Sequence, residues 1–117
     1  MPRLKRDPKA LFLQLNDLYF DGLLDPETEV RFVDFPGTGA AIDTRCDSAA
    51  IHFRTGDPAL IELHSNLHGL GADYMALALA HEMVHLKYPV KAQHHGAKVW
   101  GEEYRRLVGL GFFQSIF

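Results

Sequence analysis

The chain has 117 residues and a formal net charge of −3, with 47% hydrophobic and 23% charged residues. This length predicts a single domain over residues 1–117 with one hydrophobic core, and the composition excludes a chain that is disordered throughout. The negative charge argues against a protein built mainly to bind nucleic acid, so direct contact with nucleic acid is not expected.

The first predicted helix spans residues 8–20. Asp7 supplies a capping side chain, and Pro8 suits the first helical position because its ring fixes a helical backbone angle. Gly22 ends the helix. Leucines repeat at helical spacing at the positions Leu11, Leu15 and Leu18.

The middle of the chain has the alternation and turn residues of a small sheet. Strands are predicted at residues 29–35, 49–54 and 59–64. Turns are predicted at residues 36–39 and 56–58, and residues 40–45 form either a strand or a loop. Residues 65–71 form a polar, glycine-bearing connection. One of the two strands that precede the next helix is expected to lie at the edge of the sheet.

Two helices follow the sheet. The first runs over Ala72–Lys87 and ends before Pro89. The second is closed by Gly109, and its apolar positions are Val99, Trp100, Tyr104, Leu107 and Val108. This order predicts an α+β domain: an N-terminal helix, a three- to four-stranded, mainly antiparallel sheet, and two further helices. The apolar ending of the chain, residues 111–117, is expected to pack on the domain.

The helix at 72–87 carries the sequence His-Glu-Met-Val-His at residues 81–85. Residues four apart lie on one face of a helix, so His81 and His85 are able to bind one metal ion. Glu82 is then placed beside the metal, where its carboxylate can take a proton from the attacking water without being a ligand. The pattern predicts a Zn²⁺ site with its own general base. Burying these polar side chains in an apolar helix costs free energy, which a bound cation offsets.

A catalytic zinc site normally has three protein ligands, and the third remains open at this point. The short segment from Lys87 to residue 93 contains Pro89 and can turn the chain back, so that a histidine before the last helix faces the first two. The downstream candidates are His94, His95, Glu102 and Glu103, and the upstream ones are His52, His64 and His68. The upstream histidines are expected to have surface or hydrogen-bonding roles. Trp100 and Phe20 are predicted to be core residues.

Three segments in order resemble the SprT-like family of zinc metallopeptidases: residues 15–24 (LNDLYFDGLL), 81–87 (HEMVHLK) and 95–100 (HGAKVW). The resemblance covers nearly the whole chain. It implies a minimal zincin-like domain in which His81, His85 and His95 bind Zn²⁺ and Glu82 is the general base. His95 is chosen over His94 because it directly precedes Gly96, as in the family. Val99 departs from the family's usual aromatic residue, and Trp100 follows it.

The predicted function is therefore a zinc-dependent metallopeptidase whose partner is a peptide or protein substrate. One alternative is a binding module in which zinc only stabilises the fold. Another is a protease that a partner recruits to DNA, which the resemblance implies because some SprT-like proteins act on proteins attached to DNA. The sequence does not define the substrate or the oligomeric state.

Three features predict a cytoplasmic protein with no membrane contact. Cys46 is the only cysteine, so no disulfide forms within the chain and a reducing compartment is expected. The basic start is followed by Asp7 and Pro8 rather than by the apolar stretch of a secretory signal. No segment approaches the roughly twenty apolar residues that span a membrane.

Overall fold

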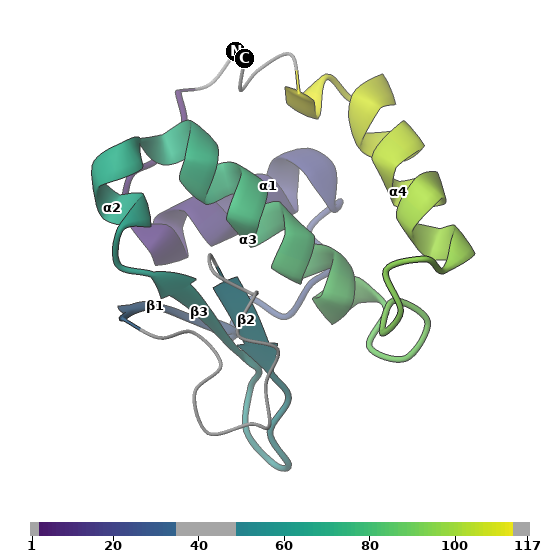
Figure 1. Ribbon diagram of the computed structural model, residues 1–117, viewed down its shortest axis with the longest axis horizontal. Coiled ribbons are helices and arrows are strands. Elements are labelled where there is room, and N and C mark those ends of the chain that lie inside the picture. The colour runs from purple at the N-terminus through teal and green to yellow at the C-terminus, as the bar shows by residue number, and fades with distance from the viewer. Residues whose placement is uncertain (1–2, 35–48, 114–117) are drawn as a thin grey trace.

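The computed structural model of the protein describes residues 3–34 and 49–113 and has an α+β fold. The elements are α1 (Pro8–Tyr19), β1 (Glu29–Val33), β2 (Ala49–His52), β3 (Leu60–His64), α2 (Leu67–Leu70), α3 (Ala72–Lys87) and α4 (Lys98–Gly109) (Figure 1). The predictions for residues 35–48, which include a turn, the undecided segment and Cys46, lie outside the described residues, as do residues 114–117.

The sheet is mixed, and the prediction of a mainly antiparallel sheet is wrong. The strand order is β1-β3-β2. β1 runs parallel to β3, with Glu29 opposite Leu60, whereas β2 runs antiparallel to β3, with Ala49 opposite Leu63. Strand direction depends on how the chain crosses between strands, and side-chain alternation carries no information about that path. Within the described sheet β2 is an edge strand and β3 is central. The prediction was that one of these two strands lies at the edge, and β2 is that strand.

One face of the sheet is apolar and forms the floor of the core. Successive side chains point to opposite faces, so the register places one set of apolar side chains together: Val30, Phe32, Ala49, Ile51, Ile61 and Leu63. These residues belong to or pack against the buried core, to which α1 contributes Leu11, Phe12 and Leu15 and α3 contributes Met75, Leu79 and Met83. The opposite face carries Glu29, Arg31 and Glu62. Helices α1 and α3 therefore cover one side of the sheet.

α1 begins where the sequence predicts, and its cap is a polar contact. The Asp7 carboxylate accepts a hydrogen bond from the Ala10 backbone N–H at 2.9 Å, which satisfies a donor that the helix leaves unpaired. Asn16 is buried on the same helix and bonds both backbone groups of Leu24 through its side-chain amide. The chain is thereby folded back after α1.

Replacing Asp7 with alanine is expected to lower the free energy of unfolding by about 1 kcal/mol, because the capped N–H loses its partner. Urea denaturation at pH 7 measures this change. Asp17→Ala is the control: Asp17 is exposed in the interior of the same helix, where alanine has the higher helix propensity. A loss of stability in Asp17→Ala as large as that in Asp7→Ala would contradict the capping role.

α3 has the predicted bounds, because the residues at its two ends favour a helix start and a helix stop. The helix follows Gly71, whose φ of 103° lies in the left-handed region that glycine adopts without strain. It stops at Tyr88, because the residue before Pro89 is disfavoured in the helical conformation. The predicted connection at 65–71 contains one helical turn, α2, which the sequence analysis missed.

α4 is held to α1 and α3 by a buried charge network. The Glu103 carboxylate, 4% exposed, accepts from Lys87 at 2.8 Å and from Arg106 at 2.6 Å. Arg106 also donates to the backbone carbonyl of Tyr19, and the Tyr19 ring packs edge-on against Phe112 at 5.0 Å. These contacts fix α4 beside the C-terminal half of α3, away from the sheet (Figure 1). The burial of Phe112 also confirms, for residues 111–113, that the apolar ending packs on the domain.

None of the helices in residues 3–34 and 49–113 combines the length and the apolar character that crossing a lipid bilayer requires.

Candidate metal centre

Three imidazole rings from two segments meet at one point beside α3. His81 and His85 lie one turn apart on the helix, and His95 comes from the loop before α4. The Nε2 atom of His95 lies 3.1 Å from Nε2 of His81 and 3.2 Å from Nε2 of His85. Three ring nitrogens therefore converge, and one ligand atom from each histidine lies within 4.8 Å of the others.

The spacing of these nitrogens fits a zinc ion. Zinc binds histidine nitrogen at about 2.0–2.1 Å with tetrahedral geometry, which places two ligand nitrogens about 3.4 Å apart. The observed separations of 3.1 and 3.2 Å are close to this value. Hydrogen bonding explains only one of these two short separations. The single proton that His95 Nε2 carries when neutral can be donated to only one of its two neighbours. A set of three histidines also leaves the fourth position of a tetrahedral ion open.

The loop that carries His95 is anchored at a buried alanine. Ala92 is fully buried, and its N–H donates to the carbonyl of Tyr88 at 3.0 Å. The Ala92 carbonyl accepts from the indole Nε1 of Trp100 at 3.1 Å. The loop is thus tied to α3 at one end and to α4 at the other, which holds His95 opposite the histidines of α3.

Trp100 packs against all three histidines. Its ring is stacked on His81 with a centroid distance of 4.8 Å and an interplanar angle of 25°. The centroids of His85 and His95 lie 4.9 and 5.1 Å from it. Sequence analysis assigned Trp100 to the core and missed this contact. The available signal was its position one residue after the place where the SprT-like family has an aromatic side chain.

The environment of the α3 histidines favours their neutral form, which is the form that binds metal. Burial and the neighbouring His95 lower the pKa of His81. Burial, followed by the proximity of His81 and His95, lowers the pKa of His85 to about 4. At pH 7 both rings therefore keep a free lone pair for an ion.

Glu82, which follows His81 on α3, carries a buried carboxyl. It is 4% exposed, and its Oε2 atom has no hydrogen-bond partner within the described part of the chain. Burial raises its pKa to about 7. A buried polar atom without a partner is uncommon in folded proteins and calls for an explanation in terms of function or a bound molecule.

The raised pKa predicts how Glu82→Gln changes the stability of the metal-free protein. Between pH 4.5 and 7 the folded state binds a proton at Glu82 that the unfolded state has lost, so stability falls as the pH rises through this window. Glutamine has no such dependence. We expect the variant to match the wild type at pH 4.5 and to be more stable at pH 8 by at most about 3 kcal/mol.

Urea denaturation in the presence of a chelator, repeated from pH 4.5 to 8, measures this difference. The histidines are common to both proteins, so their titration cancels in the comparison. A difference that does not grow with pH would contradict the buried, unpartnered state of the Glu82 carboxyl.

The other ligand candidates lie outside the cluster. His94 and Glu102 are exposed and do not join it. Glu103 was also a downstream ligand candidate, but Lys87 and Arg106 already bond to its two carboxylate oxygens. These bonds outweigh the effect of burial, which acts to raise the pKa of Glu103, and hold that pKa below its usual range. The structure therefore gives Glu103 a role in packing α4.

The histidines before the motif have local partners. His52 Nε2 lies 2.5 Å from Oε1 of Glu62 on the neighbouring strand. His64 Nδ1 accepts from the N–H of Asn66 at 3.0 Å. The side chain of His68 lies outside the described part of the structure. The contact of His52 agrees with the hydrogen-bonding role expected for it. His64, for which a surface role was expected, is partly buried and accepts this local hydrogen bond.

Comparisons with protein-family models, with curated proteins and with solved structures give no match to this chain.

Proposed function

We propose that the protein is a zinc metallopeptidase of the SprT-like, zincin-like kind, in which His81, His85 and His95 bind Zn²⁺ and Glu82 is the general base. The observation that carries the proposal is the convergence of three Nε2 atoms, two of whose separations are 3.1 and 3.2 Å. A site that only stabilises the fold normally has four protein ligands. Three ligands beside a buried carboxylate favour catalysis.

Zinc held by these histidines would polarise the peptide carbonyl and lower the pKa of a water molecule at the site. The chain itself supplies the proton transfers. As the water oxygen bonds to the carbonyl carbon, Glu82 takes a proton from the water. When the C–N bond breaks, Glu82 gives that proton to the leaving nitrogen. The acid proton left on the new carboxyl group passes to the amine, so the products are a carboxylate and an ammonium group, and the glutamate returns to its ionised state.

The environment of Glu82 supports this role. A general base is most effective when its pKa lies near the working pH, and burial raises the pKa of Glu82 to about 7. Its buried Oε2 atom has no partner among the described residues, and a water molecule admitted at the metal site would supply one. A carboxylate held by arginine or lysine, such as Glu103, would be a weaker base.

The presence of an edge strand near α3 favours the hypothesis that the substrate is a peptide. In the described sheet β2 lies at one edge and packs against α3. A substrate in an extended conformation is able to pair with such a strand through main-chain hydrogen bonds, independently of its sequence. This arrangement would bring the scissile bond beside the metal-bearing helix.

The proposal is tested by incubating the zinc-loaded protein with denatured casein and following new amino termini. We expect hydrolysis that a chelator abolishes and that added Zn²⁺ restores. Stoichiometric zinc without hydrolysis would support the binding module instead. A parallel reaction with single-stranded DNA tests recruitment to nucleic acid: hydrolysis that needs DNA would identify a DNA-associated protease.

A further inference from the structure

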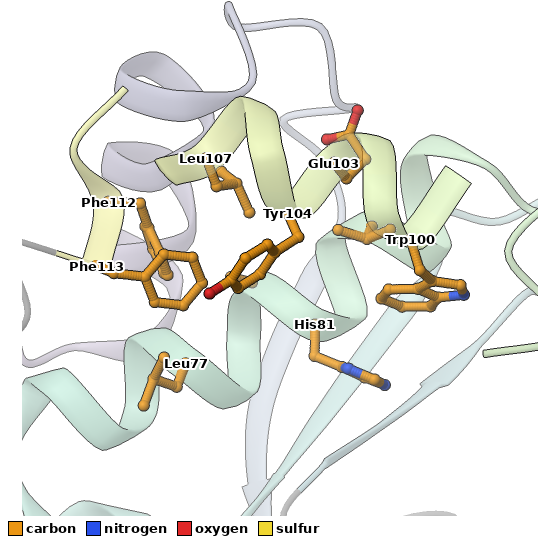
Figure 2. A pocket seen from close by; sticks show the side chains of 10 residues that line it. Leu77, His81, Trp100, Glu103, Tyr104, Leu107, Phe112 and Phe113 are labelled. Atoms are coloured by element: carbon orange, nitrogen blue, oxygen red, sulfur yellow. The ribbon is translucent and has the colours of Figure 1, made fainter. Parts of the chain in front are cut away.

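A mostly apolar cleft of about 190 Å³ opens between α3 and α4 next to the metal centre. Figure 2 shows His81 and Trp100 at one end of the cleft and Phe112 and Phe113 at the other, with Tyr104 between them. His81 is therefore both a proposed zinc ligand and a wall of the cleft. Anything bound in the cleft lies beside the proposed reaction centre.

The residues that line the cleft disfavour a charged ligand group. Leu77, Val84 and Leu107 complete the apolar walls. The only carboxylate among the lining residues is that of Glu103, and its Oε1 and Oε2 accept from Lys87 and Arg106 at 2.8 and 2.6 Å. The cleft therefore offers no free charge to pair with a charged group, and placing an unpaired charge there would be costly.

The volume of the cleft suits a ligand group no larger than one amino-acid side chain. Pockets for drug-sized ligands measure roughly 300–1,000 Å³, so a cleft of about 190 Å³ is too small for such a molecule. The buried floor, formed by Leu107 and Phe112, and the exposed rim at Tyr104 suit a side chain that enters from solvent and is covered by apolar atoms. A leucine or phenylalanine side chain meets both conditions.

We propose that this cleft is a specificity pocket that receives a leucine- or phenylalanine-sized side chain of the peptide substrate, from the residue next to the scissile bond. The inference rests on the proposed peptidase function and adds the substrate class to it. It accounts for an apolar cleft that shares the His81 wall with the metal centre.

The first experiment measures kcat/KM for zinc-loaded protein on peptides that carry Leu, Phe, Ala or Asp at each position beside the cleaved bond. A pocket that covers several methyl or methylene groups gives a preference for Leu over Ala of at least about tenfold. We expect this preference at one position, and still weaker cleavage with Asp. Hydrolysis with no apolar preference at any position would overturn the pocket while leaving the peptidase function standing.

Leu77→Phe narrows the cleft, and Leu70→Phe is its matched control. Leu70 is 56% exposed on α2 and does not line the cleft. We expect Leu77→Phe to reduce the preference for Leu over Ala to less than about threefold. Leu70→Phe should keep the wild-type preference. An unchanged preference in Leu77→Phe would overturn the assignment.

A binding experiment separates failure of the pocket from failure of the peptidase function. Trp100 is the only tryptophan of the chain and lines the cleft, so its fluorescence reports occupancy. We expect N-acetyl-leucine amide to change the emission saturably, and N-acetyl-aspartic acid amide to bind at least tenfold more weakly. If no peptide is cleaved, the peptidase function fails, and this titration alone decides the pocket: no saturable change with the leucine probe would overturn it.

Discussion

Replacing Glu82 with glutamine is expected to lower kcat/KM for peptide hydrolysis by about 10²–10⁴-fold, which is the usual contribution of a positioned general base. Glutamine has nearly the same shape but cannot take the proton from water. The three histidines are untouched, so the variant should retain one Zn²⁺ per chain. Steady-state kinetics with a fluorogenic peptide and metal analysis of the same preparation measure both quantities.

The control for this variant is Glu102→Gln, which makes the same chemical change at an exposed position of α4 outside the cluster. It should leave the rate within about twofold, as a surface substitution away from the site normally does. Measuring the higher stability expected for metal-free Glu82→Gln at pH 8 would exclude misfolding as the cause of lost activity. Full activity in Glu82→Gln would refute the proposed base.

Replacing His95 with alanine is expected to weaken zinc binding by more than about 100-fold, because replacing a residue that only hydrogen-bonds to a metal ligand already costs about 10–100-fold. Two histidines remain on α3, and a two-ligand site loses the ion during dialysis. Zinc per chain after dialysis, and competition with a chromophoric chelator, measure the loss. Co²⁺ is a suitable second probe, since Trp100 lies 5.1 Å from the His95 ring and its emission should respond to the bound ion.

His94→Ala is the matched control, because it removes the adjacent, exposed histidine that does not join the cluster. It should keep the affinity of the wild type. If the two variants exchange roles, and His94→Ala loses zinc while His95→Ala keeps it, the third ligand is His94 and the loop binds the ion in a different conformation.

The helices were predictable because their signals are local. The Asp7 and Pro8 start of α1 and the stop before Pro89 depend on residues next to the helix ends, and both agree with the structure. α2 was missed because four residues, one of them Gly69, carry too little periodicity to stand out from a loop. The prediction of a mainly antiparallel sheet was wrong because the parallel direction of β1 relative to β3 follows from the path of the chain across the sheet.

The candidate site also has one part that local sequence signals predict and another part that they do not. The positions of His81 and His85 on one helix face follow from helical geometry alone, whereas the approach of His95 depends on the path of the ten-residue loop 88–97, which the sequence does not specify. The cleft was not predicted, since it arises from the distance and angle between α3 and α4. That geometry depends on the bond between Lys87 and Glu103, sixteen positions apart, and no periodic pattern encodes it.

The charge network on α4 has a consequence for how the protein handles metal ions. Because Glu103, Arg106 and Phe112 fix α4 through contacts that include no metal, the three histidines are held in place without one. A zinc finger unfolds when its ion is removed, since the ion supplies the folding energy. In the proposed zinc protein the ion would instead be an exchangeable component: stripped protein should keep its fold and be reconstituted with Co²⁺ or Mn²⁺, giving a series of proteins that differ only in their metal.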